Sequence, residues 1–328
     1  MPVIALDLGG TKLATAIFDA GGKLLHRDSV PLDGRSGSEV ASLVAQRCEG
    51  ATGGVGVTVP GIYRAERGTV WAPNIPGWDD YPLRDELRRV VSPDTPVVID
   101  SDRAGYILGE VWRGAARGAR HAIFLAVGTG IGAGIMVDGR VLRGHGDIGG
   151  AIGWLALDRP FRDEYKACGC FEYHASGPGL AKVARERLVS DHDYDGDLRK
   201  VEPMALTAER IFAAFEQGDA LATEVLDDAI MFWGMAAANL VSLFNPEVIV
   251  FGGGIFGPAA RFLDRIQEEA VRWAQPIAVK ETRFVASKLG GDAGLYGAAR
   301  LALLARAEMP AMRSDAARRG THPFPPGS

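Results

Sequence analysis

The segment IALDLGGTK, at residues 4–12, carries an apolar run into a glycine turn with a carboxylate at its mouth. A second β-rich run follows at residues 13–18, and DAGG at residues 19–22 turns the chain into a third run at residues 23–26. Glycines let backbone N–H groups approach an anion closely, because no Cβ stands in the way. The segment therefore predicts a β-hairpin whose turn is either a phosphate loop or an ordinary tight turn.

The polar groups of this turn suggest their own roles if it holds phosphate. Gly9 and Gly10 would offer backbone N–H groups, Thr11 would add a hydroxyl donor, and Lys12 completes the candidate phosphate-binding set. Asp7 is placed to hold a metal-bound water rather than the anion itself. A Walker loop needs G-x-x-x-x-G-K-[ST] before a helix, so this turn between two strands belongs to another type.

The same layout returns at residues 123–142, IFLAVGTGIGAGIMVDGRVL, with a strand, a Gly/Thr turn, a strand, an Asp/Gly turn and a strand. Two copies of one unit predict a duplicated α/β domain, in which crossover helices cover each sheet. Gly128, Thr129 and Gly130 form the second candidate phosphate turn. Two such turns would hold a polyphosphate from both sides.

Composition narrows the class of protein. A chain of 328 residues suits about two domains, and 47% hydrophobic residues support full cores. The net charge of −5 and the pI near 5.8 give no electrostatic footprint for nucleic acid. We expect no membrane span, since no apolar run reaches the necessary ~18 residues, and no basic segment precedes the first strand. Three cysteines without a disulfide pattern complete the expectation of a soluble, cytoplasmic protein.

Asp102 is the candidate for proton chemistry. It follows the predicted strand at residues 96–100, at the carboxyl end where α/β sheets bind ligands, and it opens a predicted helix at residues 103–112. One interpretation is a helix N-cap, which Asp and Ser both favour and which the sequence alone prefers. The other is a base that takes the proton from a substrate hydroxyl.

A third glycine turn closes the predicted buried strand at residues 247–251. It consists of Gly252, Gly253, Gly254 and Ile255. Bare backbone there is suited either to carrying the base and ribose of a nucleotide or to a plain strand-to-helix turn.

Taken in order, these motifs resemble the ROK family of bacterial sugar kinases, in the actin-like ATPase superfamily, over residues 3–305. They are D-x-G-G-T-K at residues 7–12, P-N-x-P-x-W at 73–78, the Asp102 helix ending in LGE at 108–110, G-T-G-I-G-x-G at 128–134, G-C-x-E at 169–172 and G-G-G-I at 252–255.

The resemblance implies a two-lobed, duplicated α/β fold of the actin-like (ribonuclease H-like) type, with a cleft between the lobes that closes on sugar. It implies an N-terminal lobe at 1–117 for sugar and phosphate, a nucleotide lobe at 118–290 and a helix at 291–306 that packs back on the first lobe. Residues 307–328 read as a disordered tail. The family also implies ATP, Mg²⁺ oriented by Asp7 through water, a homodimer, and Asp102 as the general base.

The chain departs from the family around residues 150–154, GAIGW, where the family usually reads G-E-x-G-H. The missing His is also a zinc ligand, and the zinc loop is shortened around Cys168 and Cys170. A structural zinc wants four ligands, so we expect none, with apolar packing of Trp154 in its place. The alternatives are that Trp154 stacks on an apolar sugar face or fills space left by a smaller or deoxygenated substrate. The candidate substrate contacts are Gly61, Asn74, Ser101, Asp102, Gly150, Trp154 and Glu172.

The sequence therefore predicts an ATP-dependent sugar kinase, glucokinase-like, that transfers the γ-phosphate to a hydroxyl of a hexose, a hexose derivative or another polyol. The alternative is a non-catalytic sugar- or nucleotide-binding relative, a sensor without a DNA-binding domain. Retained Asp7 and Asp102 favour the kinase, since a mere binder needs neither. The altered residues Ser101, Ala151 and Trp154 predict that plain glucose binds less well than in an unmodified glucokinase pocket.

Overall fold

The computed structural model describes residues 1–319 and divides them into two compact units. Unit 1 comprises Met1–Gly109 together with the chain from Gly294 onward, and unit 2 comprises Glu110–Ala293. The chain thus passes from unit 1 to unit 2 within one helix and returns at the start of another.

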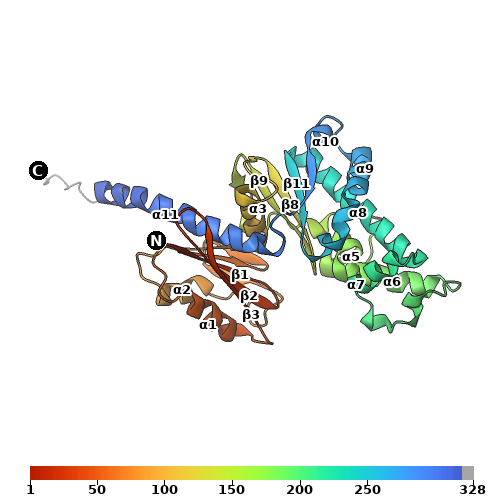
Figure 1. Cartoon of the computed structure of the whole chain (residues 1–328), viewed down its shortest axis with the longest axis horizontal. Helices are drawn as coiled ribbons and strands as arrows, with labels where there is room; N and C mark the ends of the chain where they lie inside the picture. Colours follow the sequence, from red (N-terminus) through yellow and green to blue (C-terminus); the bar gives the residue numbers. More distant parts are fainter. Residues whose placement is uncertain (320–328) are drawn as a thin grey trace, which may run out of the picture. The chain divides into compact units, whose positions relative to one another are not determined.

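Unit 1 is built on a five-stranded sheet in the order β3-β2-β1-β4-β7. Figure 1 labels β1, β2 and β3 of this sheet. β1 pairs antiparallel with β2 and parallel with β4, and β4 pairs parallel with β7. The strands are β1 (Val3–Leu8), β2 (Lys12–Phe18), β3 (Leu24–Pro31), β4 (Val55–Val59) and β7 (Val97–Ser101), with a separate hairpin of β5 (Ile62–Arg64) and β6 (Thr69–Trp71). The helices are α1 (Gly37–Cys48), α2 (Leu83–Val90), α3 (Asp102–Arg113) and α11 (Ala293–Arg319).

Helices cover both faces of this sheet. Apolar residues of α1 and α2, such as Val40 and Leu87, form one core with Leu6 and Val57 of the strands. On the other face α11 lies so close to β4 that a Cβ on Gly56 would clash with the carbonyl oxygen of Ala298. Backbone that approaches this closely requires glycine.

Unit 2 repeats the arrangement with a five-stranded sheet in the order β10-β9-β8-β11-β12. The strands are β8 (Ala122–Val127), β9 (Ile131–Val137), β10 (Arg140–Val141), β11 (Val248–Gly252) and β12 (Arg283–Ala286). The α-helices are α4 (Tyr165–Cys168), α5 (Cys170–Ala175), α6 (Gly177–Ser190), α7 (Ala208–Glu216), α8 (Ala220–Phe244), α9 (Leu263–Trp273) and α10 (Ala278–Glu281). Short 3₁₀ helices are η1 (His145–Asp147), η2 (Ile152–Trp154), η3 (Asp197–Lys200), η4 (Pro203–Ala205), η5 (Gly254–Phe256), η6 (Pro258–Phe262) and η7 (Gly290–Asp292).

The two sheets share one order and one set of pairings. β8 pairs antiparallel with β9 and parallel with β11, as β1 does with β2 and β4. This confirms the predicted duplication and the α/β fold class.

Helix α8 is the central helix of unit 2. It is long and apolar enough to cross a membrane by length and composition, which the sequence had led us not to expect. However, 61% of its apolar window is buried, and residues such as Trp233 and Ala237 pack in the unit 2 core. A core helix of a globular unit has this character, since it is apolar on nearly every side.

The last helix differs from the expectation. The sequence predicted a helix over 291–306 and a disordered tail over 307–328, whereas α11 continues to Arg319. The alanines and arginines at 311–319 favour a helix, whereas Pro310 within α11 disfavours one. Residues 320–328 of the predicted tail lie outside the described residues.

Candidate active site

Asp7 is held at the carboxyl end of β1 by a neighbouring strand. The parallel register places Asp7 beside Thr58 of β4, and the Thr58 hydroxyl donates a 2.7 Å hydrogen bond to Asp7 Oδ1. Gly294, in the first turn of α11, also lies against this carboxylate, since a Cβ there would clash with both Asp7 oxygens. The Asp7 side chain is therefore fixed from two directions.

The first glycine turn follows Asp7 directly. The Gly9 N–H donates to the carbonyl oxygen of Lys12 at 2.9 Å and closes the turn, which leaves Gly10, Thr11 and Lys12 exposed. Asn74 lies against it, because a Cβ on Gly10 would be 3.4 Å from Asn74 Cβ. The structure thus brings Asn74 to the first candidate phosphate turn.

Asp102 is the first residue of α3, directly after β7. Its Oδ1 accepts a 2.7 Å hydrogen bond from the Arg103 N–H. The N-terminal cap is instead Ser101, whose Oγ accepts from the Ala104 N–H at 3.3 Å. Ser101 thus takes the capping role that the sequence alone preferred for Asp102, because α3 begins at Asp102, one residue earlier than we expected.

The environment of Asp102 makes it a stronger base than an exposed aspartate. Burial, together with the nearby Asp7 carboxylate, outweighs the opposing Arg103 guanidinium and raises the pKa of Asp102 to about 6. A carboxylate with a pKa near 6 is ionised at neutral pH and accepts a proton more readily than one at 3.8.

Gly61 is linked to α3 by the side chain of Arg103, the residue after Asp102. Its carbonyl oxygen accepts a 3.2 Å hydrogen bond from Arg103 Nη2. Gly61 itself has φ +84°, and a Cβ there would clash with the carbonyl oxygen of Trp71. Only glycine fits this turn after β4.

The second glycine turn, between β8 and β9, lies at the start of a helix. The Gly128 N–H donates to the Gly130 carbonyl oxygen at 3.0 Å, and the Gly128 carbonyl oxygen accepts from the Gly177 N–H at 2.8 Å. Helix α6 begins at Gly177 and is capped by Ser176. The partial positive charge of a helix N-terminus therefore lies beside this turn, which favours an anion.

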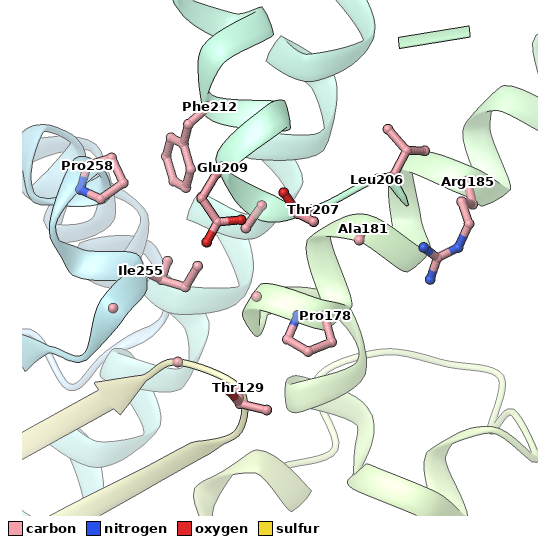
Figure 2. A pocket seen from close by; sticks show the side chains of 14 residues that line it. Thr129, Pro178, Ala181, Arg185, Leu206, Thr207, Glu209, Phe212, Ile255 and Pro258 are labelled. Atoms are coloured by element: carbon pink, nitrogen blue, oxygen red, sulfur yellow. The ribbon is translucent and has the colours of Figure 1, made fainter. Parts of the chain in front are cut away.

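A pocket of about 700 Å³ opens at this turn, entirely within unit 2. Figure 2 shows Thr129 on the β8–β9 turn, with Pro178 of α6, Glu209 of α7 and Ile255 of η5 around the same hollow. Phe212 adds an aromatic wall. A volume of this size with apolar walls and few polar groups suits an organic ligand.

The third glycine turn contributes only in part to the lining. Gly254 and Ile255 line the pocket, while Gly252 and Gly253 do not. A Cβ on Gly252 would clash with the ring of Phe124, and one on Gly253 would clash with Val127. These two glycines allow the end of β11 to lie close against β8, and Gly254 follows them directly in the chain.

Glu172 supports the second glycine turn. Its Oε2 accepts a 2.7 Å hydrogen bond from the Ile131 N–H. The same oxygen would lie 3.0 Å from a Cβ on Gly130 or on Gly153. Burial raises the pKa of Glu172. The predicted substrate contact is therefore also a structural partner of the turn.

Trp154 is not packed in the core. The sequence predicted apolar packing in place of a zinc ligand, but 57% of the Trp154 surface is exposed. The 3₁₀ helix η2 buries Ile152 and Gly153 and so turns the third side chain outward.

Gly150, with φ +86°, packs against the carbonyl oxygen of Ala133 on β9.

Around Cys168 and Cys170 the side chains form an aromatic and polar network. His174 Nε2 lies 2.7 Å from the Tyr165 hydroxyl, which also donates to Asp158 at 3.2 Å. The His174 ring stacks on Phe232 with centroids 4.4 Å apart. Among residues 1–319, no group of three or more Cys, His, Asp or Glu side chains is arranged to hold a metal ion. The residues present do not fit a structural zinc, and its absence stays a prediction.

Known proteins resemble this chain in both sequence and architecture. A sequence profile of the ROK family matches residues 3–305. The chain belongs to the ROK family. It is 31% identical to a glucokinase of Halalkalibacterium halodurans over 90% of this chain and 92% of the relative. Among solved structures it resembles a ROK hexokinase of Thermus thermophilus, with a TM-score of 0.77 and 32% identity over 93% of this chain and 98% of that one. It also resembles a ROK family glucokinase of Streptomyces griseus, solved with glucose and AMPPNP, with a TM-score of 0.73 and 28% identity over 92% and 99% of the chains.

These ROK relatives confirm the predicted class, an ATP-using sugar kinase that phosphorylates an alcohol group. The domain boundaries, the individual site residues and the homodimer stay predictions.

The structure adds residues to the candidate active site that were not predicted from the sequence. Thr58, Arg103 and Gly294 surround the two aspartates, and Pro178 and Glu209 line the pocket. Two of these had a usable signal. Thr58 is the residue that a parallel pairing of the first and fourth strands places beside Asp7, and Gly177-Pro178 marks a helix start.

Proposed function

We propose that this ROK kinase transfers the γ-phosphate of ATP to a hydroxyl of a hexose or hexose derivative, with Asp102 as the general base. The single observation that carries the assignment is the Asp102 carboxylate at the carboxyl end of β7, whose pKa burial raises to about 6. A general base is most effective when its pKa lies near the working pH.

Asp102 accepts the proton as the substrate oxygen attacks phosphorus. The Arg103 N–H holds one carboxylate oxygen at 2.7 Å, which limits rotation of the side chain and leaves acceptor capacity for the alcohol. Phosphoryl transfer needs in-line positioning and neutralised charge more than covalent chemistry. Holding the attacking hydroxyl on a fixed carboxylate supplies that positioning.

The unit 2 pocket is the proposed ATP site, and its charges suggest how ATP lies in it. The turn at Gly128 and Thr129 and the start of α6 favour the phosphates. Hydrogen bonds from the Thr207 hydroxyl and its own backbone N–H lower the pKa of Glu209, so this carboxylate is negative and repels phosphate. The ribose and base therefore lie toward Glu209 and Phe212. Gly254 and Ile255 form one wall of that part of the pocket.

Asp7 is the proposed holder of Mg²⁺ through water. Carboxylate oxygen is a ligand type that Mg²⁺ prefers, and the exposed turn after Asp7 leaves room for water. Bound Mg²⁺ neutralises charge on the transferred phosphate. In this proposal Gly9, Gly10, Thr11 and Lys12 contact the phosphate, and Thr58 and Gly294 keep Asp7 in place.

The proposed sugar contacts are Asn74 beside Gly10, the Gly61 turn, Ser101, and Gly150, Trp154 and Glu172 of unit 2. Because Trp154 is 57% exposed, its indole is available to stack on the apolar face of a sugar. Ala151 stands where the family usually has a glutamate, so a hydrogen-bonding side chain is missing there. This favours a substrate that makes fewer hydrogen bonds than glucose at that position.

ADP release over a panel of hexoses, amino sugars, deoxy sugars and polyols tests this proposal. We expect ATP consumption that depends on a sugar, with a lower KM for a glucose derivative than for glucose. Trp154→Ala should raise the sugar KM with little change in kcat, whereas Trp273→Ala, at another exposed tryptophan, should change neither. ATP consumption that no sugar or polyol stimulates would contradict the proposal, and glucose turnover at the lowest KM would contradict the substrate assignment.

A further inference from the structure

Helix α3 places a tyrosine one turn after the proposed base. Asp102 and Tyr106 are four residues apart on α3, so their side chains lie on one face of the helix. The Tyr106 hydroxyl forms a hydrogen bond with the Asp102 carboxylate, and Tyr106 is itself partly buried. Asp102 belongs to one of the motifs by which the sequence resembles its family, whereas Tyr106 is not among the residues quoted for that motif.

The position of α3 leaves Tyr106 little freedom to move. Gly105, its neighbour, packs so closely on Thr58 that a Cβ would clash with the Thr58 methyl group. A Cβ on Gly297 of α11 would likewise clash with the Gly105 carbonyl oxygen. Thr58 in turn bonds Asp7 at 2.7 Å, so one packed set of backbone segments fixes Asp7, Asp102 and Tyr106 relative to one another.

The hydroxyl of Tyr106 acts as a donor in this pair. Burial, followed by the Asp102 and Asp7 carboxylates, raises the pKa of Tyr106 well above its ordinary value, so the phenol keeps its proton at every working pH. An ionised carboxylate has only acceptors, and a phenol that keeps its proton must therefore donate to it. The charged or titratable groups around Asp102 are Arg103 and Tyr106 of α3 and Asp7 of β1.

We propose that Tyr106 is a positioning residue, whose hydroxyl bonds the Asp102 carboxylate and, together with the Arg103 N–H, aims its remaining acceptor at the substrate hydroxyl. This proposal rests on the assignment of Asp102 as the base. The Arg103 N–H alone fixes one oxygen, and the second bond stops the carboxylate from turning about its Cβ–Cγ axis.

Tyr106→Phe removes the hydroxyl and keeps the ring. A hydrogen bond to the ionised form lowers a carboxyl pKa, so its loss should shift the acidic limb of kcat/KM to higher pH by about one unit. We expect kcat to fall about fivefold at pH 6 and less at pH 8, with the KM for ATP unchanged. The matched control is Tyr81→Phe, which removes a hydroxyl that donates to Glu86 at 3.3 Å in the same unit and should leave the profile unchanged.

Tyr106→Ala separates packing from hydrogen bonding. If Tyr106 only fills space, Phe restores the wild-type profile where Ala does not, and the proposal is overturned. If the wild-type enzyme shows no acidic limb near pH 6, the assignment of Asp102 as base fails. If that limb is present and Tyr106→Phe leaves it in place, the positioning role alone fails.

Discussion

Asp102, the proposed general base, lies where an ionised carboxylate is unfavourable. Its pKa of about 6 in the folded chain lies above the ordinary value of 3.8, because burial disfavours the ionised carboxylate. An acid of this kind lowers the stability of the fold once the pH exceeds its ordinary pKa, and the loss is complete above the pKa of the folded state.

We therefore predict that Asp102→Asn stabilises the fold at neutral pH. The gain in melting temperature should be small at pH 4, grow up to about pH 6 and stay constant above it, because only the ionised form is costly. Thermal unfolding of both proteins across pH 4–8 measures this. A gain that is the same at all pH values would show that Asp102 is not buried as a charge.

Thr58 is a second residue with a defined task at the site. It is fully buried and its hydroxyl bonds Asp7 at 2.7 Å. Thr58→Val should lower kcat by roughly 10-fold to 100-fold, since a hydrogen bond to a charged group contributes about 1.5–3 kcal/mol. It should also raise the Mg²⁺ concentration needed for half-maximal rate.

A matched variant separates this effect from lost stability. Thr95 is also buried in unit 1, where its hydroxyl bonds the Ala51 carbonyl oxygen at 3.0 Å. Thr95→Val should leave kcat and the Mg²⁺ requirement unchanged. Equal kinetic losses in the two variants would show that Thr58 acts only through the fold.

The layers of unit 1 depend on backbone contact between strand and helix. Gly56 of β4 lies against the carbonyl oxygen of Ala298 on α11, and backbone cannot move aside as a flexible side chain can. We predict that Gly56→Ala lowers the free energy of unfolding by about 1–3 kcal/mol, the usual cost of overpacking.

Urea denaturation measures this difference, with Gly291→Ala as the control. A Cβ on Gly291 meets no atom within 4 Å, so its effect should stay within about 0.5 kcal/mol. If the two variants unfold at the same urea concentration, the close packing of α11 on β4 is not what holds this layer.

The regular elements were largely predictable from sequence because each carries its own signal. The hairpins of residues 4–26 and 123–142 combine apolar runs with Gly turns, and both appear in the sheets. The short β5–β6 hairpin was missed, since three-residue strands carry too little periodicity. The exposure of Trp154 was mispredicted because one 3₁₀ turn decides which of three side chains faces out, and no pattern over three residues encodes that.

The site was predictable in its motifs and not in its supports. Asp7, Asp102 and the glycine turns could be found from short patterns. Thr58 and Gly294 are far from Asp7 in sequence and become its neighbours only through strand register and the return of α11. Glu209 reaches the pocket because α7 begins there, which local sequence does not reveal.

The predicted absence of a structural zinc ion can be tested through the stability of the whole protein. In place of a four-ligand site, this ROK kinase has the network of Tyr165, His174 and Asp158. We predict that EDTA leaves the melting temperature unchanged while it abolishes kinase activity, and that Mg²⁺ alone restores the activity. Stoichiometric zinc in the purified protein, or a lower melting temperature after chelation, would contradict this.

Both units must contribute to one turnover, because the proposed ATP pocket belongs to unit 2 and the proposed base to unit 1. Single-turnover transfer of labelled γ-phosphate to the preferred sugar, in wild-type protein and in Asp102→Asn, tests whether Asp102 is the general base, with ATP and sugar binding measured separately. We predict transfer slowed by about 10²–10⁴-fold with both ligands bound as in the wild type, since that is the usual contribution of a general base. Transfer at the wild-type rate in Asp102→Asn would show that Asp102 is not the general base.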